Sequence, residues 1–329
     1  MQRRVSSDDL QVHEHTMSQK ALEKLFPIKN FVSDLSTPLL QSAASQNGTS
    51  GRLVVVGDVH GMHKSLQALL EKVDFSKQNG DHLILVGDLV NKGPDSSSVI
   101  DLAMRLGASA VRGNHDNAVL KAATEIKARE ENPSQGSSGD TLPENSEATS
   151  SGETVQDPNN ADKPASSPKY ETASSLSTTQ LDWLAELPLI LRVKLPQYTS
   201  STLGDSLIIV HAGLAPGIPL EDQDPHAVMH LRSLVHPPGD ETSLTPAEAP
   251  GDESWIVEWD KWQEGLSSKS TVIFGHDAKR RLQLGKYTIG IDSGCLYGNQ
   301  LSAVVIAASE SGIEHQIVQV ECADAHLVV

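Results

Sequence analysis

The chain has 329 residues, of which 38% are hydrophobic and 4% aromatic, with a formal net charge of −17 and a pI near 5.1. This length allows one large domain or two of ordinary size, with a core built mainly from Val, Leu, Ile and Ala. The acidic balance argues against a surface that coats nucleic acid, because such a surface needs a basic face. No stretch reaches the roughly 20 apolar residues of a membrane span, and the polar N-terminus lacks the apolar region of a signal peptide.

The two cysteines, Cys295 and Cys322, do not imply a disulfide framework. They suit a reducing interior, although two cysteines discriminate poorly between compartments. Cys295 is interpreted as a packing residue, because the sequence places no base beside it. We therefore expect a cytoplasmic protein, with a vacuolar location as the alternative if a targeting segment is missing from this chain. The sequence leaves the oligomeric state open and is compatible with a monomer.

Residues 1–51 are predicted to be a polar and largely disordered leader. The pattern changes at Arg52, where two short aliphatic runs, RLVVVGD and HLILVGD, indicate buried strands. Helical spacing follows each of them, in MHKSLQALLEKV and DSSSVIDLAMRLG, and a third strand and helix are predicted in ASAVRGNHD and NAVLKAATEIKARE. This alternation of strand and helix predicts βαβ units and a mainly parallel sheet.

A stretch at about 130–177 is rich in Ser, Pro, Gly, Asn and acidic residues. Because this composition cannot bury enough apolar surface to order itself, we predict a disordered insertion within a single domain of residues 52–323. After the insertion, a short helix in TTQLDWLAELP precedes further strand candidates that are often separated by turns alone. They indicate a second, mixed sheet in an α/β fold, and residues 324–329 are predicted to be a tail.

Polar side chains stand directly after five of the predicted strands, nearly all of them beside glycine. In chain order they are Asp58 and His60 in GDVHG, Asp88 in GDLVNKGP, Asn114 and His115 in GNHD, His211 in VHAGL, and His276 in FGHD. In sheets of this kind, ligands bind outside the carboxyl ends of the strands. One such turn is weak evidence, since Gly, Asp and His are common in surface turns. The whole set in this order predicts a metal site.

This combination of residues suits a two-metal phosphoesterase, in which two divalent ions roughly 3.5–4 Å apart clamp the phosphate and a bridging hydroxide attacks in line. Asp88, central in the order, is the predicted bridge, and His115 is placed to protonate the leaving oxygen. The remaining ligands would fill two shells: Asp58 and His60 in one, and Asn114, His211 and His276 in the other. Mixed oxygen and nitrogen ligands favour Mn, Fe, Zn or Co over Mg or Ca.

These motifs resemble those of the calcineurin-like metallophosphoesterases, in the branch that unites phosphoprotein phosphatases with bacterial diadenosine-tetraphosphate hydrolases. Within it the chain is closer to the hydrolases, the ApaH-like phosphatases. GDLVNKGPDS has the form GDLVxxGP, GNHD carries Asp where protein phosphatases usually carry Glu, and IDSGCLYGNQLSA matches the hydrolase ending rather than SAPNYC. The resemblance covers roughly residues 52–128 and 180–306. It implies a four-layer α/β/β/α sandwich of two mixed sheets, with the metal site at the strand C-terminal ends.

Two neighbouring positions depart from the protein phosphatases, which carry Asp-Arg where this chain has Asn91 and Lys92. Their aspartate orients the catalytic histidine, so the resemblance leaves that role open for Asn91, which we assign to substrate binding. Lys92 keeps a positive charge near the phosphate but lacks the bidentate fork of arginine. Arg232, downstream of HAGL, matches the family's phosphate-contacting arginine, and a helix-surface arginine is the alternative.

The resemblance implies a dimetal enzyme that hydrolyses phosphoanhydride bonds in inorganic polyphosphate or dinucleoside polyphosphates. Polyphosphate is slightly favoured, because only Tyr297 and Trp259 could offer a stacking platform for a base near the motifs. One alternative is a Ser/Thr phosphoprotein phosphatase, against which Asn91, Lys92 and the missing SAPNYC ending argue. The other is a non-catalytic scaffold with a Ser-rich interaction segment, which the complete set of ligand types disfavours.

Overall fold

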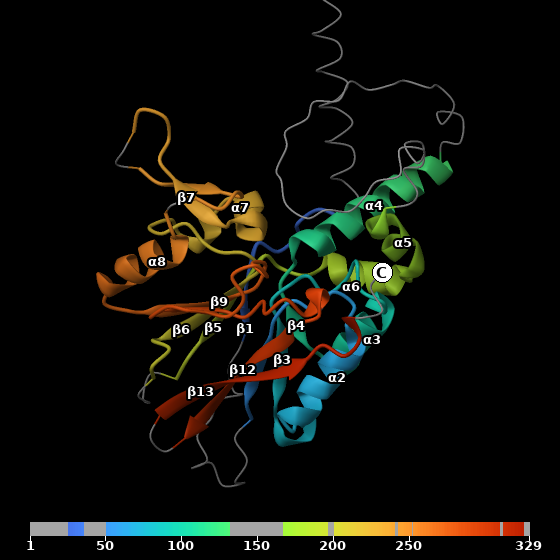
Figure 1. Ribbon diagram of the computed structural model, residues 1–329, viewed down its shortest axis with the longest axis horizontal. Coiled ribbons are helices and arrows are strands. Elements are labelled where there is room, and N and C mark those ends of the chain that lie inside the picture. Colours follow the sequence, from blue (N-terminus) through green and yellow to red (C-terminus); the bar gives the residue numbers. More distant parts are fainter. Residues whose placement is uncertain are drawn as a thin grey trace, which may run out of the picture.

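The computed structural model describes residues 26–35, 51–131, 167–196, 201–240, 243–251, 253–309 and 312–325. Its two large sheets are covered on their outer sides by helices, with α2 to α6 on one side and α7 and α8 on the other (Figure 1). The predicted α/β fold with two mixed sheets is confirmed. Within the described ranges, no helix has both the length and the apolarity needed to cross a bilayer.

The first sheet has five strands in the order β13-β12-β2-β3-β4. Its three parallel strands are β2 (Leu53–Val56), β3 (His82–Leu85) and β4 (Ser109–Ala110). An antiparallel hairpin, β12 (Gln300–Ser309) and β13 (Gly312–Glu321), joins them through β12 and β2. The connections are α2 (His63–Lys72), η1 (Lys77–Asn79), α3 (Ser96–Leu106) and, after β4, α4 (Asn114–Glu131). The predicted βαβ units are present, although the third strand is short.

The second sheet has six strands in the order β1-β5-β6-β9-β11-β10. Its members are β1 (Val32–Leu35), β5 (Ile190–Lys194), β6 (Ser206–Val210), β9 (Ser270–Phe274), β10 (Gln283–Leu284) and β11 (Thr288–Gly290). A small ribbon of β7 (Ser233–Val235) and β8 (Thr245–Ala247) stands apart from both large sheets. Two further helices, α5 (Pro168–Ser175) and α6 (Thr178–Ala185), pack against α4 and α3 on the side of the first sheet. The remaining helices and 3-10 turns are η4 (Leu220–Asp222), α7 (Pro225–His230), α8 (Trp255–Glu264) and η5 (Cys295–Tyr297).

Strand β2 shows why an unbroken apolar run was needed at this position. Leu53 and Val55 belong to the core between the sheets, where Ile273 of β9 also lies. Val54 and Val56 point the other way, into the core beneath the helices of the first sheet. A strand buried on both faces has no polar alternation, and all four side chains are fully buried. The polar residues that follow such a strand therefore emerge at the edge of the core.

Three boundaries predicted from composition need correction. Part of the leader forms β1, which pairs in parallel with β5 at the edge of the second sheet. The insertion predicted to reach residue 177 contains α5, where Tyr170 donates a hydrogen bond to Glu125 of α4 and Ala173 is buried. Asp324, in the predicted tail, is also buried. Each segment is held by contacts with a distant part of the chain, which local composition does not reveal. Residues 1–25, 36–50, 132–166 and 326–329 lie outside the described residues.

Candidate metal centre

The carboxyl ends of strands from both sheets meet at one place, and the predicted ligands stand there. Five of the six predicted metal ligands are buried, and the sixth is partly buried. They follow β2, β3, β6 and β9 or, for one of them, begin α4 just after β4: Asp58, His60, Asp88, Asn114, His211 and His276. All except His211 line one cavity of about 90 Å³, and His211 contacts Asn114, Asp88 and His276.

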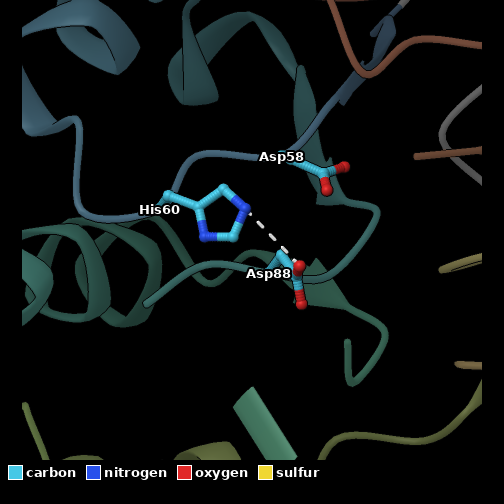
Figure 2. Close-up of side chains that lie close together, drawn as sticks. All are labelled: Asp58, His60 and Asp88. Carbon is cyan, nitrogen blue, oxygen red and sulfur yellow. Dashed lines mark ion pairs between the residues drawn. The ribbon is translucent and has the colours of Figure 1, made fainter. Parts of the chain in front are cut away.

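The first group of ligands comes from the loops after β2 and β3. Asp58, His60 and Asp88 each have a candidate ligand atom within 4.8 Å of those of the other two. Figure 2 shows these three side chains close together, and its dashed line joins His60 Nε2 to Asp88 Oδ2, which are 3.5 Å apart. The Asp58 carboxylate also accepts the His276 backbone N–H, at 3.1 Å from Oδ2. This contact ties the first group to the loop that follows β9.

The second group comes from the other loops and reaches the same aspartate. His211 Nε2 lies 2.9 Å from Asn114 Oδ1 and 3.4 Å from Asp88 Oδ1. The rings of His211 and His276 meet edge to face, with their centroids 5.0 Å apart. Asp88 thus has one oxygen toward each group, as the predicted bridge between two ions requires.

The backbone at these ligands is held in a conformation that most residues avoid. His60, Asp88 and His276 have φ angles of 46°, 50° and 69°, in the left-handed region that costs a non-glycine residue roughly 1–3 kcal/mol. Such strain concentrates at functional sites, where the surrounding structure enforces it. The neighbouring glycines are needed for close approach. A Cβ atom on Gly113 would collide with the Asp88 carboxylate, and one on Gly275 with that of Asp58.

Asp116 fixes two of the ligand loops against each other. This residue is fully buried, and its Oδ2 accepts the Gly113 N–H at 2.9 Å. Its Oδ1 accepts the N–H groups of Leu89 and Val90, at 2.9 and 3.2 Å. The loop that carries Asp88 and the loop that carries Asn114 are therefore clamped by one carboxylate that is not itself a predicted ligand.

The carboxylates of the centre are strongly desolvated. Burial raises the pKa of Asp88 to about 7, and burial also raises the pKa of Asp58 well above its usual range, with the charges of Asp292 and Asp88 adding to the effect. Burial raises the pKa of Asp292 to about 6. Ionised carboxylates gathered in a poorly solvated place repel one another, so the cluster favours bound cations or protons.

The imidazoles of the centre are neutral, as metal ligands must be. Burial lowers the pKa of His211 to about 4 and lowers the pKa values of His60 and His276 well below the usual range. His60 Nδ1 and His276 Nε2 are buried without a hydrogen-bond partner. Buried polar atoms are rarely left unpaired. Carboxylate oxygens, an amide oxygen and neutral ring nitrogens form a donor set that fits divalent transition metals.

The arrangement agrees with a family model. Residues 51–280, which are 230 of the 329 residues, match the model for calcineurin-like phosphoesterases. The chain belongs to the calcineurin-like phosphoesterase family. Enzymes of this family use a dimetal centre, and the chain is a metal-dependent hydrolase.

Individual calcineurin-like relatives are similar over most of their length. The chain is 27% identical over 276 residues to a zinc-dependent endopolyphosphatase of Saccharomyces cerevisiae, covering 82% of this chain and 80% of that protein. It is 25% identical over 297 residues to a symmetrical bis(5'-nucleosyl)-tetraphosphatase of Vibrio parahaemolyticus, covering 76% of this chain and 93% of the relative. A crystal structure of a protein provisionally assigned as a diadenosine tetraphosphatase superposes with a TM-score of 0.60 and 30% identity, covering 89% of this chain and 98% of the other.

The other predicted site residues of this phosphoesterase divide into two kinds. His115, Lys92 and Arg232 line the same cavity as the ligands. Arg232 also lies 3.5 Å from Asp277 Oδ1, which holds its guanidinium beside the centre rather than on a free helix surface. Asn91, assigned from the sequence to substrate binding, is only 4% exposed and contacts His115 instead. Its backbone lies in the left-handed region at this point, with φ at 78°.

Asp292 is a residue of the centre that the sequence reasoning missed. It follows β11 at the same edge, is buried, and lines the cavity beside Asp58. Its Oδ1 accepts the Gly294 N–H at 3.0 Å. The signal was present, because IDSG is a further strand that ends in an acidic residue beside a glycine-containing turn.

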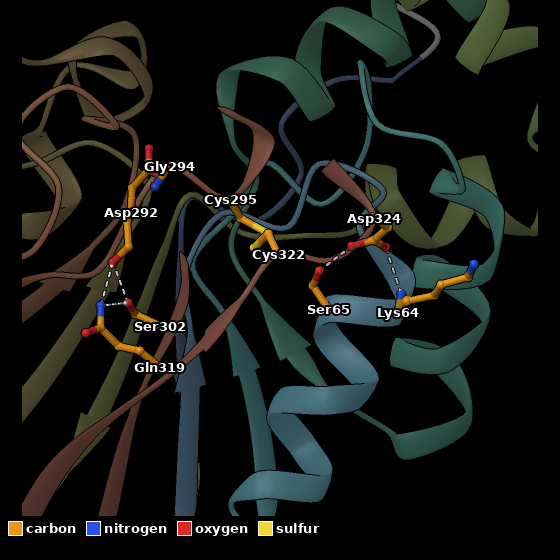
Figure 3. Close-up of a disulfide and its surroundings, with 10 residues drawn as sticks. Lys64, Ser65, Asp292, Gly294, Cys295, Ser302, Gln319, Cys322 and Asp324 are labelled. Carbon is orange, nitrogen blue, oxygen red and sulfur yellow. Dashed lines mark hydrogen bonds between the residues drawn. A yellow bond between two sulfur atoms is a disulfide. The ribbon is translucent and has the colours of Figure 1, made fainter. Parts of the chain in front are cut away.

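The cysteines correct a second expectation. Cys295 and Cys322 form a disulfide with their Cα atoms 5.4 Å apart, whereas the sequence had indicated packing without a disulfide. The hairpin of β12 and β13 brings together residues that are 27 positions apart in the chain. Beyond it, the Asp324 carboxylate accepts the Lys64 N–H at 3.0 Å and the Ser65 hydroxyl, as Figure 3 shows. The C-terminal segment thus joins the Asp292 loop to the start of α2.

Proposed function

We propose that this protein hydrolyses phosphoanhydride bonds, with inorganic polyphosphate preferred over dinucleoside polyphosphates. The observation that carries the proposal is a pair of cations beside the carboxylate and imidazole cluster. Lys92 and Arg232 both line the cavity, and neither is a metal ligand. Bound metal ions would neutralise the phosphoryl oxygens and lower the pKa of a bound water. The two side-chain cations would neutralise further phosphates of the same chain.

The size of the cavity supports a substrate that enters by one phosphate at a time. Its volume of about 90 Å³ is small, since pockets that enclose a drug-sized ligand measure about 300–1,000 Å³. A single phosphoryl group fits such a space, while the rest of a polyphosphate or a nucleotide would extend outside. The interior of the cavity therefore recognises a phosphate group, and the residues around its opening decide the selectivity among phosphoanhydride substrates.

Little at the rim favours a nucleobase. Trp259, one of the two aromatic candidates from the sequence, is 1% exposed and packs in the core under α8. Tyr297 is 68% exposed and lines the cavity. Among the described residues that line the cavity, it is the single Phe, Tyr or Trp. One stacking partner adds roughly 1–3 kcal/mol per base, whereas extra phosphates would meet two cations. This difference supports polyphosphate as the preferred substrate.

We propose zinc or manganese as the metals. The mixed oxygen and nitrogen donors suit Zn, Mn, Fe or Co, and the similar yeast endopolyphosphatase is zinc-dependent by name. Loading the metal-free protein with each ion in turn, and counting bound ions by mass spectrometry, tests this choice. Two equivalents of zinc or manganese per chain are expected. Tight binding of magnesium alone would contradict it.

The test of the substrate is a comparison of kcat/KM for polyphosphate, diadenosine tetraphosphate and a phosphothreonine peptide under one zinc condition. The proposal predicts that order. A phosphopeptide in first place would make the protein a phosphoprotein phosphatase, and the dinucleotide in first place would reverse the preference within the anhydrides. Arg232→Gln should weaken polyphosphate turnover most, while Arg105→Gln removes the same charge from an exposed site on α3 and should change little.

The disulfide bears on the compartment. Disulfides persist mainly in oxidising environments, so we propose a compartment more oxidising than the cytoplasm, in line with the vacuolar alternative. Cells would be lysed in an alkylating reagent, and the redox state of Cys295 and Cys322 read from the mass of the intact protein. Two unmodified cysteines are expected. Complete alkylation would place the protein in a reducing compartment.

A further inference from the structure

The loop that follows β9 carries a carboxylate that contacts two arginines. Asp277 is buried, and its two oxygens face different side chains. Its Oδ1 lies 3.5 Å from Arg232 Nη1, and its Oδ2 accepts a hydrogen bond from Arg280 Nη1 at 2.9 Å. The same Nη1 atom of Arg280 also donates to the backbone carbonyl of Arg232, at 3.0 Å. One buried carboxylate therefore holds two guanidinium groups next to each other.

The backbone around Asp277 fixes the second of these arginines. A turn at 278–280 closes on the Asp277 carbonyl, which accepts the N–H groups of Arg280 and Arg281 at 3.0 and 3.1 Å. Arg281 has a φ angle of 58°, a left-handed conformation that a non-glycine residue keeps only where its surroundings enforce it. Arg280 is thus held through its backbone and through its guanidinium. A side chain held in this way loses less conformational entropy when it binds a ligand.

The two arginines differ in their position relative to the cavity. Arg232 lines it, as does Ala278 of the turn, whereas Arg280 stands beside the lining residues and not among them. The side chain of Arg280 is 41% exposed, against 29% for that of Arg232. Both hydrogen bonds that described residues accept from the Arg280 side chain come from Nη1. Since a guanidinium has five N–H donors, the others are available to a ligand just outside the cavity.

The charge of this turn contrasts with that of the whole chain. Lys279, Arg280 and Arg281 are consecutive cations, and all three are exposed, although the formal net charge of the chain is −17. A local site of one charge raises the concentration of an oppositely charged ligand around it. Guanidinium groups bind phosphate through two parallel N–H bonds, which gives both strength and orientation. The turn is therefore suited to a phosphate that lies at the edge of the cavity.

We propose that Arg280 binds the phosphate next to the one held in the cavity, and that Asp277 is the residue that positions it. Linked phosphates share a bridging oxygen, so the neighbour of an enclosed phosphoryl group lies directly outside. Asp277 keeps Arg280 beside Arg232, and the two guanidinium groups then face two consecutive phosphates. A phosphate monoester has no second phosphate to offer this site. The inference rests on the proposed anhydride activity and names the residue that recognises the second phosphate.

Inhibition of nitrophenyl phosphate hydrolysis tests this site without cleavage of an anhydride. Methylenediphosphonate carries two linked phosphonates that water does not separate, and orthophosphate carries one phosphate. Both are measured as inhibitors at a buffered concentration of free zinc, because the diphosphonate also binds zinc. Arg280→Gln should raise the ratio of the diphosphonate inhibition constant to the orthophosphate constant about 10–100-fold, the effect of one lost hydrogen bond to a charged group.

Two further variants show whether the effect belongs to this site. Arg105→Gln removes the same charge from an exposed position on α3, and it should leave the ratio within roughly twofold, because distant surface charges are screened. Asp277→Asn should raise the ratio by a smaller factor than Arg280→Gln, since the arginine remains but is held less firmly. An unchanged ratio in Arg280→Gln, or the same rise in Arg105→Gln, would overturn the proposal. An unchanged ratio in Asp277→Asn would overturn the positioning role.

Turnover gives a second measurement of the same site. Arg280→Gln should lower kcat/KM for tripolyphosphate, relative to that for nitrophenyl phosphate, by at least about tenfold. Equal losses on the two substrates would make Arg280 merely structural and overturn the proposal. A wild-type enzyme that does not hydrolyse tripolyphosphate would refute the proposed function instead. In that case the two inhibition constants would still decide whether Arg280 binds a second phosphate.

Discussion

The substitution Asp88→Asn distinguishes the contribution of the Asp88 charge to metal binding from its effect on the stability of the fold. Asp88 places one oxygen toward His60 and the other toward His211, at 3.5 and 3.4 Å from their Nε2 atoms. Asparagine has nearly the same shape as aspartate. Its Oδ1 can still accept the backbone N–H of His115, which in the wild type donates to Asp88 Oδ1 at 2.9 Å. It removes only the negative charge that two cations would share.

Asp88→Asn should weaken metal binding but raise the free energy of unfolding of the metal-free protein. Loss of an outer-sphere partner costs roughly 10–100-fold in metal affinity, so loss of a bridging charge should cost at least about 100-fold. Burial raises the pKa of Asp88 to about 7, against an ordinary value of about 3.9. A raised pKa means stability that is present at low pH and is lost as the pH rises through about 7. At pH 8 the metal-free wild type therefore carries a penalty of up to about 4 kcal/mol that the variant lacks.

The assay is urea unfolding of both metal-free proteins at pH 8, with zinc content and turnover measured beside it. The metal-free variant should be more stable than the metal-free wild type, while it retains less zinc and shows no measurable turnover. A less stable variant would refute the burial argument. Full activity with two zinc ions retained would refute the bridging role of Asp88.

Four further predictions follow from the same structure. His115→Gln should keep both metals and slow poor leaving groups by roughly 10²–10⁴, with a nitrophenyl ester partly rescued; a parallel fall in metal content would make His115 a ligand. Cys322→Ser opens a disulfide that spans 27 positions and should lower the free energy of unfolding by about 3.5 kcal/mol; equal urea midpoints for the two proteins would contradict this. Zinc loading at pH 6 should release about one proton from Asp88, whereas at pH 8 Asp88 is already ionised and should release none. Calorimetry in two buffers of different ionisation enthalpy measures this release, and equal release at pH 6 and pH 8 would argue against the raised pKa of Asp88. Deleting residues 132–166 while keeping α5 should preserve zinc content and turnover, since loop length changes closure entropy only slowly; an insoluble product would show that the segment is structural.

The metal ligands could be predicted from the sequence because each of them follows an apolar run, which is a local pattern. Each ligand stands directly after an apolar run, and a run buried on both faces must deliver its next residues to the edge of the core. Asp58 and His276 come from different sheets, yet the same rule applies to β2 and β9. The rule acts strand by strand and places each ligand at the edge of the core, and the packing of the two sheets then brings these edges together.

What sequence reasoning missed depends on contacts between distant segments. β1 is a strand because the edge of β5 offers it hydrogen bonds, and α5 is ordered against α4 through Tyr170 and Ala173. The Cys295–Cys322 bond exists because a hairpin closes. Composition windows describe a segment alone, so they cannot reveal a partner elsewhere in the chain.

The role of Asn91 shows a different limit. The sequence placed it near the catalytic histidine, but two readings of an amide at that position, toward substrate or toward the ring, could not be separated. Only the backbone angle and the Lys92 N–H decide which way the side chain faces. Left-handed backbone at a non-glycine residue is not encoded in any simple pattern.

Anomalous X-ray diffraction at the zinc edge, from crystals of zinc-loaded protein, would locate the two metal ions that we expect on either side of Asp88. Two anomalous peaks roughly 3.5–4 Å apart are expected, one next to Asp58 and His60 and the other beside Asn114, His211 and His276, with the Asp88 carboxylate between them. A single peak, or peaks that leave Asp88 without a metal contact, would contradict this expectation.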